Sequence, residues 1–304
     1  MLRILKFWNL IKQFCMLKKL DQFLKQNFPG LHGWLKGYTR SFKKSVNPQI
    51  GRPEFVEILR RDLKVKEGDV LFIHSSMRNL YVLFDKQEIM DILLEVVGQE
   101  GTLLFPCWHF NVRAEDYIKQ HEVVFDVNNS PSAMGKISDV LRSNPLACRS
   151  FHPTNSVIAL GKHARELTTG HEEGIYPCGV KSPWHKMMQY NAKVVGIGVT
   201  VDNLTFVHAV EDFVKDDFPI KTRMDTVFSC KCVDKNGGIK MIDTLVASTS
   251  ISPRDVVGFF KKHISTKAYR SVKVKNMDFF SLDTVPIFDE IKKLALADKT
   301  IYKF

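Results

Sequence analysis

The sequence has few cysteines for its length, and none of them are paired at the usual metal-binding spacing. Six cysteines, at positions 15, 107, 148, 178, 230 and 232, are scattered over 304 residues without any C-x-x-C pair. A disulfide framework is therefore not expected, and the thiols fit a reducing cytoplasm. We expect no metal site, because the single C-x-C at Cys230 and Cys232 lies in an alternating strand pattern without a second ligand pair nearby.

Long uncharged hydrophobic runs are also missing. No stretch approaches the roughly 20 apolar residues that a membrane span needs. The first residues lack a continuous apolar region and a small-residue cleavage site, so a secretory signal is not expected. The sequence predicts a cytoplasmic protein, with the inner face of the membrane as the alternative location.

Acidic residues are almost absent from the first 50 positions. This region holds ten Lys or Arg residues and one acid, Asp21, so it carries +9 of the net charge of +11 and leaves only +2 for the rest of the chain. Leu, Ile, Phe and Trp recur among the lysines, a spacing that fits an amphipathic helix up to about Asn27. The "PG" at 29–30 is expected to end this helix, and a shorter aromatic segment follows.

The basic extension has two equally supported interpretations. Its helix can lie on an anionic membrane surface through about residues 1–30. It can instead pack on the body or on a second subunit, which would make an oligomer, with its lysines simply solvated. Nucleic-acid binding is disfavoured, because no recognised motif accompanies the charge. We predict a basic amphipathic helical extension at 1–50 and one domain at 51–304.

Beyond residue 50, helical patterns alternate with short apolar runs. Helices are expected at 53–63, 86–98, 133–143, 181–191, 203–212, 254–263 and 286–297, and strands at 70–74, 101–108, 156–161, 193–199 and 269–274. Gly98 is expected at a helix C-terminus, and Ser182 is expected to cap the helix that begins with Pro183. "DKNGG" at 234–238 predicts a hairpin. This alternation indicates a layered α/β core.

The segment "GIGVTV" (196–201) is similar to a dinucleotide-binding fingerprint but does not complete it. The third glycine position is occupied by Val201, and no second strand ending in an acid follows at the expected distance. The two glycines are therefore expected to permit close packing.

Two short segments are ambiguous when taken alone. In "HSSMRNL" (74–80), Ser75 and Ser76 follow a predicted strand and can line an anion site, although Ser-Ser is common in ordinary loops. "RSFHPTNSV" (149–157) gathers Arg149, His152 and Ser156 around a turn fixed by proline.

The segment "NLTFVHAVED" (203–212) is the strongest candidate for chemistry. It places Thr205, His208 and Glu211 at three-residue steps, which would put them on one face of a helix. A lone histidine on an apolar helix face is more often a buried core residue. A carboxylate within reach favours a general base, because it fixes the imidazole tautomer and raises its basicity.

Five segments of the body, in this order, resemble the successive signatures of the aminoglycoside N(3)-acetyltransferase family. They are "VLFIHSSM" (70–77), "GQEGTLLFP" (98–106), "SAMGKISDVLRSNPLACRSFHPTNSVIALGKHARELTTGHE" (132–172), "YPCGVKSPWHKM" (176–187) and "KVVGIGVTVDNLTFVHAVE" (193–211). The resemblance covers about residues 52–300, and the extension has no counterpart in it.

The resemblance implies an α/β sandwich of the aminoglycoside N(3)-acetyltransferase type and transfer of an acetyl group from acetyl-CoA, without a metal, to a primary amine on a sugar. It implies that His208 is the general base, that Glu211 is its partner and that Thr205 lies near the thioester carbonyl. The residues implied near the cofactor are His74, Ser75, Ser76, Met77, Arg149 and Ser150. The residues expected at the acceptor are His152, Ser182, Asp202 and Asp212, and a solvated face is the alternative for the two aspartates.

The chain also departs from the family pattern. Leu80, Tyr81 and Val82 stand where the family has a glycine-rich segment, and Cys178 replaces an aromatic residue. With the basic extension, these changes favour an N-acetyltransferase acting on an amino sugar, nucleotide- or lipid-linked, in cell-surface glycan biosynthesis. The alternatives are an aminoglycoside 3-N-acetyltransferase that confers antibiotic resistance and, from another class, a non-catalytic membrane-associated glycan-binding protein.

Overall fold

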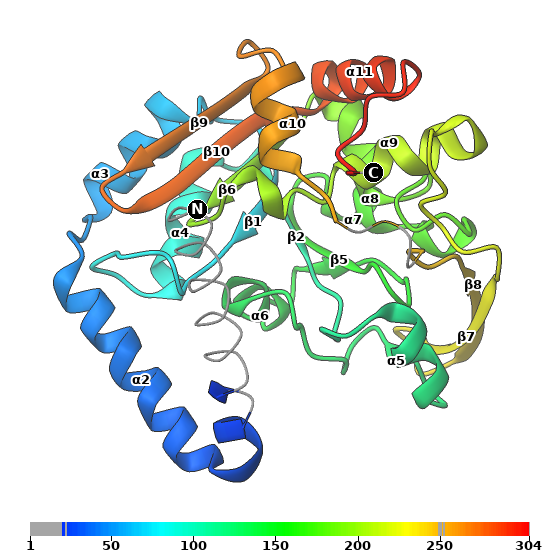
Figure 1. The fold of residues 1–304 in the computed structure, drawn as a ribbon, viewed down its shortest axis with the longest axis horizontal. Coiled ribbons are helices and arrows are strands. Elements are labelled where there is room, and N and C mark those ends of the chain that lie inside the picture. Colours follow the sequence, from blue (N-terminus) through cyan, green and yellow to red (C-terminus); the bar gives the residue numbers. More distant parts are fainter. Residues whose placement is uncertain (1–19, 22, 249–250, 252, 304) are drawn as a thin grey trace, which may run out of the picture. The chain divides into compact units, whose positions relative to one another are not determined.

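A mixed sheet of seven strands runs through the body of the protein, residues Ile50–Phe304 (Figure 1). The computed structural model describes residues 20–21, 23–248, 251 and 253–303. The strand order is β4-β5-β2-β1-β6-β10-β9, in which β1 is parallel to β2 and β6 and the other pairs are antiparallel. The strands are β1 (Val70–Ser75), β2 (Thr102–Pro106), β4 (Cys148–Arg149), β5 (Val157–Gly161), β6 (Lys193–Ile197), β9 (Tyr269–Val274) and β10 (Met277–Asp283).

Helices cover both faces of this sheet. Successive residues of a strand point to opposite faces, so neighbours along one strand pack into different cores. Phe72 belongs to one hydrophobic core, whereas its neighbours Leu71 and Ile73 belong to the other. The first core is covered by α7 (Ala164–Thr168), α8 (Pro183–Lys186), α9 (Val207–Val214), α10 (Val256–His263) and α11 (Thr284–Ala295). The second is covered by α3 (Arg52–Glu57) with its continuation η1 (Ile58–Asp62), α4 (Lys86–Val97) and α6 (Lys136–Arg142). The predicted layered α/β sandwich is confirmed.

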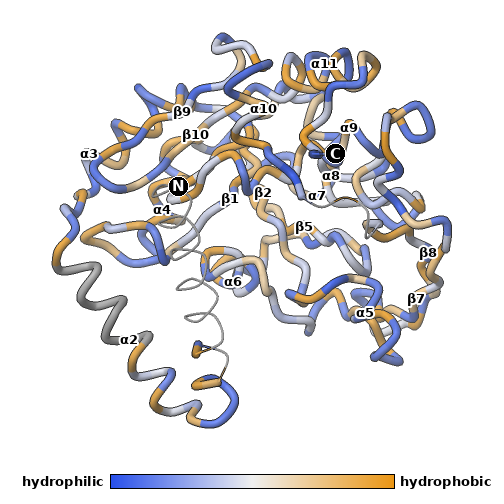
Figure 2. The backbone as a smooth tube through the Cα atoms, viewed as in Figure 1, coloured by the Kyte–Doolittle hydropathy of each residue, from blue (hydrophilic) through white to orange (hydrophobic). Residues whose placement is uncertain are grey.

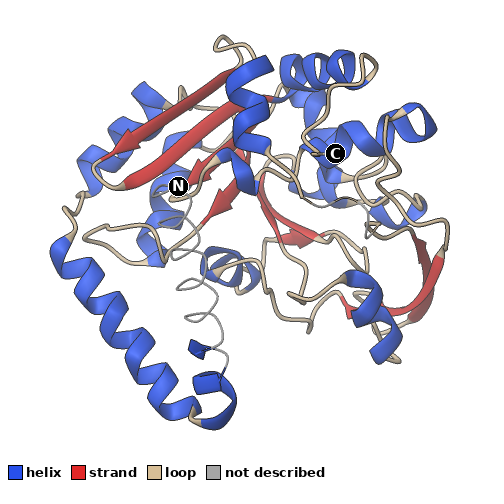
Figure 3. Ribbon diagram, in the orientation of Figure 1, coloured by secondary structure: helices blue, strands red, loops and turns tan. Residues whose placement is uncertain are grey.

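A small three-stranded sheet, β3-β7-β8, stands apart from the large one (Figure 3). Its strands are β3 (Phe125–Asp126), β7 (Phe228–Val233) and β8 (Ile239–Thr244), and the hairpin between β7 and β8 turns at Gly237, as predicted. Cys230 and Cys232 lie on the buried face of β7 as free thiols. The remaining elements are α5 (Ala114–Gln120), η2 (His171–Glu173), η3 (Met187–Tyr190), η4 (Val201–Asn203) and η5 (Lys215–Asp217).

Two predicted helix ends and the packing role of the glycines are confirmed. Gly98 ends α4 with φ 65°, and the Ser182 side chain accepts a hydrogen bond from the His185 amide at the start of α8. Gly196 lies under the Phe280 ring, where a Cβ atom would come within 2.1 Å of the ring, and Gly198 has φ +68°. Strand β10 was not predicted, because it is buried on both faces and shows no alternation of polar and apolar residues.

The N-terminal unit, Met1–Gln49, is helical in its described part. Described residues between 20 and 27 are helical, and α2 (Pro29–Val46) then runs for 18 residues. The segment expected after "PG" is itself helical: Pro29 begins α2, at a position where its missing N–H costs nothing. Hydrophobic and hydrophilic residues alternate along the described part of α2 (Figure 2). The helix predicted over residues 1–19 lies outside the described residues.

The body begins at Ile50, one residue before the predicted boundary. Ile50 is fully buried, its amide donates to the Tyr81 carbonyl and its carbonyl accepts from the Leu83 amide. Within the described residues, no helix has the length and apolar character required to cross a membrane.

Candidate active site

Helix α9 follows β6 and the short helix η4, and it carries the histidine and the glutamate that the sequence placed together. The His208 Nδ1–H donates to Glu211 Oε2 at 2.8 Å. Thr205 lies one turn earlier, but α9 begins at Val207, so Thr205 belongs to the preceding turn and not to the helix face. Its carbonyl accepts the His208 amide at 3.1 Å, which keeps the two residues adjacent.

The Glu211 carboxylate is buried and held at both oxygens. Its second oxygen, Oε1, accepts a 2.6 Å hydrogen bond from the Tyr302 hydroxyl. Burial alone would raise the pKa of Glu211, but the charge and hydrogen bond of His208, the charge of Arg223 and the Tyr302 hydroxyl offset it, so the pKa is lowered from its ordinary value. The carboxylate therefore stays ionised and fixes the tautomer in which His208 carries its proton on Nδ1.

The other ring nitrogen of His208 is left for chemistry. Nε2 forms no hydrogen bond with any residue that the structure describes. The imidazole lines a cavity of about 370 Å³, which we call the His208 hollow. Its lining residues are Trp108, Phe110, Ala114, Thr154, Asn155, Thr205, His208, Arg223, Val246, Ala247, Ile251, Arg254 and Tyr302.

Thr205 is oriented by two aromatic neighbours. The Trp184 indole N–H donates to Thr205 Oγ1 at 2.8 Å, and His74 Nε2 lies 3.3 Å from the same oxygen. Burial lowers the pKa of His74 to about 3, so this imidazole is neutral. The Thr205 hydroxyl thus accepts from Trp184 and has its own proton free to donate, either to His74 or into the hollow.

Asp212 follows Glu211 and has a different role from the one expected. Its carboxylate is buried and forms two hydrogen bonds with the Arg223 guanidinium, at 2.6 and 2.9 Å. It also accepts the Cys178 amide at 2.7 Å. Asp212 is therefore neither on a solvated face nor free to hold a cationic acceptor, because its charge is already neutralised. Asp202 is exposed, and its predicted contact with substrate stays a prediction.

The residues predicted near the cofactor fall into two groups. Ser75, Ser76 and Met77 are half-buried at the end of β1, and within the described part of the chain neither serine hydroxyl has a hydrogen-bond partner. Arg149 is occupied by the protein: it contacts the carbonyls of Cys107, Val127, Ser130 and Pro131 and the hydroxyl of Ser156. Arg149 thus holds the surrounding loops, and its contact with a cofactor stays a prediction.

Ser150 and His152 belong to a buried polar network. Ser150 Oγ accepts the Val157 amide and lies 2.9 Å from His171 Nδ1, while His171 Nε2 donates to the Pro177 carbonyl at 2.8 Å. His152 stacks on His171 with ring centroids 4.3 Å apart. Burial lowers the pKa of both histidines, that of His171 to about 3, so both are neutral. Roles of Ser150, His152 and the buried Ser182 in binding stay predictions.

Sequence reasoning missed three residues of the site: Trp184, Arg223 and Tyr302. Trp184 lies inside the segment "SPWHK", which was used as a helix start and as part of a family signature, without a role for the tryptophan. Arg223 and Tyr302 lie 12 and 91 residues beyond Glu211 in segments with no motif. No spacing rule connects them to His208, so only the fold could bring them there.

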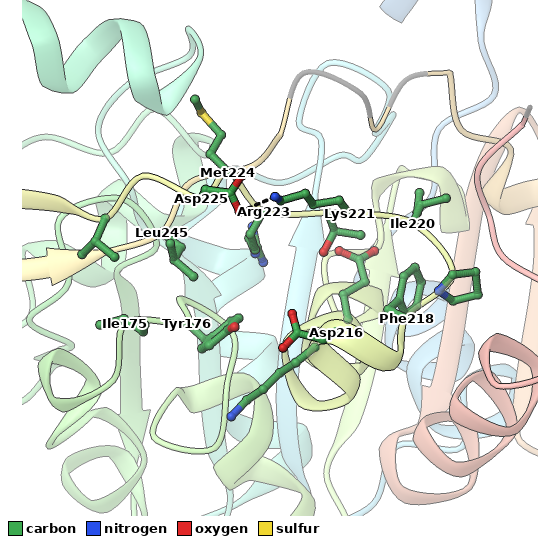
Figure 4. Close-up of a pocket in the computed structure, with 15 residues that line it drawn as sticks. Ile175, Tyr176, Asp216, Phe218, Ile220, Lys221, Arg223, Met224, Asp225 and Leu245 are labelled. Atoms are coloured by element: carbon green, nitrogen blue, oxygen red, sulfur yellow. Dashed lines mark ion pairs between the residues drawn. The ribbon is translucent and has the colours of Figure 1, made fainter.

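A second cavity, of about 470 Å³, shares Arg223 with the first (Figure 4). We call it the Tyr176 hollow. It is lined by Ile175, Tyr176, Glu211, Lys215, Asp216, Phe218, Pro219, Ile220, Lys221, Thr222, Arg223, Met224, Asp225, Val227 and Leu245. Lys221 and Asp225 form an ion pair at its rim, and the Lys215 ammonium lies 5.1 Å from the Tyr176 ring centroid. Neither hollow holds a metal site: no group of three or more His, Cys, Asp or Glu residues in the described parts could bind one.

Known proteins share both the sequence pattern and the fold. A model of the aminoglycoside 3-N-acetyltransferase family matches residues 72–295. Aminoglycoside N(3)-acetyltransferase IX of Micromonospora chalcea is 27% identical over 250 residues, which cover 75% of this chain and 87% of that protein. AAC-IIIb, solved as a binary complex with CoASH, has a TM-score of 0.69 at 21% identity, with 84% of this chain and 100% of that chain covered. AAC-VIa bound to sisomicin has a TM-score of 0.68 at 22% identity, with coverage of 83% and 100%.

These likenesses confirm the type of α/β sandwich expected from the sequence. The matched region contains β1 from Phe72 onward, the "RSFHP" turn, Trp184 and the whole of α9, and it stops before Tyr302. The chain belongs to the aminoglycoside 3-N-acetyltransferase family.

Proposed function

We propose that this N-acetyltransferase moves the acetyl group of acetyl-CoA to an amine of an aminoglycoside, with His208 as the general base. Membership of the family makes the chain an acetyl-CoA-dependent acyltransferase, as the sequence predicted. The relatives are named for aminoglycosides, and their solved structures include complexes with CoASH and with sisomicin. These names support an aminoglycoside over the cell-surface glycan that the sequence favoured.

One observation carries the mechanism: His208 Nδ1 is hydrogen-bonded to an ionised, buried Glu211, and the imidazole lines the hollow with Nε2 free of any described partner. An ammonium group must lose a proton before its nitrogen can attack a thioester carbonyl. Nε2 is the only nitrogen of His208 that can take this proton, because Nδ1 already carries one. The imidazolium that forms is stabilised by Glu211, whose charge lies 2.8 Å away.

Thr205 places a hydroxyl donor in the same hollow as the base. Negative charge develops on the carbonyl oxygen during attack and needs a hydrogen-bond donor already in place. The Thr205 hydroxyl accepts from the Trp184 indole, so its proton is available for an oxygen in the hollow. We assign it that role. Direct transfer from donor to amine needs no protein nucleophile.

The residues present fit an acyl-thioester donor. Trp108 and Phe110 give the His208 hollow apolar walls beside Thr205 and His208. The half-buried hydroxyls of Ser75 and Ser76, free of partners among the described residues, can serve the amides or phosphates of the donor's arm.

The acceptor is tested by following thiol release from acetyl-CoA. Sisomicin and gentamicin, a nucleotide-linked amino sugar and glucosamine are compared at equal concentration. We expect kcat/KM for the aminoglycosides to exceed that for the others by at least 100-fold. Preference for the nucleotide-linked sugar would restore the glycan assignment. If no amine supported turnover, the result would favour the alternative of a non-catalytic glycan-binding protein.

We further propose that the N-terminal unit binds an anionic membrane surface. It carries +9, and Leu20, Phe23, Phe28 and Leu31 expose about half of their surface. Charge repulsion between two such units disfavours pairing with a second copy. The full-length chain should sediment with phosphatidylglycerol vesicles more than with phosphatidylcholine vesicles. Replacing Phe23 and Phe28 by serine should abolish this, whereas replacing the exposed Leu83 and Leu146 should not; equal pelleting of all variants would reject the proposal.

A further inference from the structure

Tyr302 contacts Glu211 but lies outside the region that the family model matches. The matched region ends at residue 295, and Tyr302 lies on the segment that follows α11. Its hydroxyl donates to Glu211 Oε1 at 2.6 Å, while His208 donates to Oε2 of the same carboxylate. One unbroken line of hydrogen bonds therefore joins Tyr302, Glu211 and His208.

Tyr302 can act on this line only as a donor. The residue is buried, and burial together with the neighbouring carboxylate raises the pKa of its hydroxyl above the ordinary value of 10. The hydroxyl therefore remains protonated while the enzyme works and cannot accept the proton that His208 collects. Its single proton is committed to Glu211, so the hydroxyl has no proton to donate to the substrate.

The backbone around Tyr302 is fixed by residues 253–255, just before α10. The Asp255 amide donates to the Ile301 carbonyl at 2.7 Å, and the Lys303 amide donates to the Pro253 carbonyl at 3.0 Å. An ion pair of 2.9 Å between Lys303 and Asp255 adds to these two bonds. Ile301 is buried in the same core as α9 and α11. The backbone that carries Tyr302 is thus fixed in place.

We infer that Tyr302 is a positioning residue for the reaction: it fixes the carboxylate of Glu211 and thereby aims Nε2 of His208 at the acceptor amine. A carboxylate with one free oxygen can rotate about its terminal bond, and a donor on each oxygen removes that freedom. The inference rests on the proposed role of His208. It extends the active site into residues 301–303, outside the family match.

Tyr302→Phe tests the inference, because it removes the hydroxyl and leaves the ring. We expect kcat to fall about 10- to 100-fold, the range for losing a hydrogen bond to a charged group, with KM for acetyl-CoA unchanged within twofold. Tyr269→Phe is the matched control: Tyr269 is a half-buried tyrosine on β9, packed against Phe260, and its variant should keep full kcat.

A double variant separates positioning from a merely structural role. If Tyr302 acts through His208, then Tyr302→Phe should cost no further turnover in a His208→Ala chain. An additional tenfold loss there, or an unchanged kcat in the single variant, would overturn the inference. The proposed function has a separate test: it would be wrong if His208→Ala retained activity. If Tyr302→Phe had normal activity while His208→Ala were inactive, the inference about Tyr302 would be wrong and the proposed function would still hold.

Discussion

Two hollows meet at Arg223, and the smaller of them is the one that His208 lines. The Tyr176 hollow measures about 470 Å³ and the His208 hollow about 370 Å³. In the first, Lys221 and Asp225 form an ion pair with each other (Figure 4). In the second, one imidazole nitrogen lacks a described partner and is backed by a buried carboxylate. A reactive site is recognised by an oriented, unsatisfied group on buried supports, and not by its volume.

The largest effect expected from this comparison is on turnover. His208→Ala removes the general base, so kcat should fall by about 10²- to 10⁴-fold in the thiol-release assay. Tyr176→Phe, in the other hollow, should leave kcat unchanged, because its ring only packs beneath the Lys215 ammonium. A greater loss in Tyr176→Phe than in His208→Ala would reverse the assignment of the two hollows.

Arg223 forms the wall between the hollows, and its loss should mainly affect stability. Arg223→Met leaves Asp212 buried without its cation, and breaking a buried pair in this way costs about 3–5 kcal/mol. Urea denaturation should show this decrease in the free energy of unfolding. Replacing both residues, as Arg223→Met with Asp212→Leu, should recover a large part of it. If the double variant were less stable than the single, the ion pair would not explain the cost.

The buried His74 should make the free energy of unfolding depend on pH. Burial lowers its pKa from 6.5 to about 3, so below pH 6.5 the unfolded chain binds a proton that the folded chain refuses. The unfolding free energy should therefore decrease as the pH falls from 6.5 toward 3, by about 1.4 kcal/mol per pH unit from this group. In His74→Gln, urea denaturation between about pH 6 and pH 4 should show a slope smaller by that amount. Parallel pH curves for the two proteins would contradict this prediction.

The smallest effect is expected at the rim of the Tyr176 hollow. Asp225→Asn removes the ion pair with Lys221, and both side chains are more than half exposed. Such pairs contribute about 0–1 kcal/mol, so the melting temperature and the KM for an aminoglycoside should hardly change. A tenfold rise in KM would show that this hollow binds an ammonium group of the acceptor. Both hollows would then take part in the reaction.

The sequence was sufficient for the parts of the site that lie close together along the chain. Thr205, His208 and Glu211 fall within seven residues, and Ser182 lies next to the proline that begins its helix, so local periodicity and capping rules could find them. The alternating helices and strands of the body likewise predicted its layers. Strand β10 escaped because a strand buried on both faces has no alternating pattern.

Tertiary pairing could not be predicted in the same way. Asp212 was expected on a surface that holds cations, yet the fold brings Arg223 against it and buries both. Arg149 was expected at a cofactor, and the sequence did not indicate the loop carbonyls that its guanidinium contacts in the fold. A charged residue gives the same signal in sequence whether it will meet solvent, ligand or another residue, because that outcome depends on distant segments.

The two-sided hold on Glu211 has a consequence for how each catalytic cycle ends. Nδ1 of His208 is committed to the carboxylate, and Tyr302 closes the far side of that carboxylate with a proton it does not release. No relay leads from the imidazole into the protein interior through these groups. In the proposed reaction, the proton that His208 takes at Nε2 therefore leaves from Nε2 as well, to product, water or buffer in the cavity.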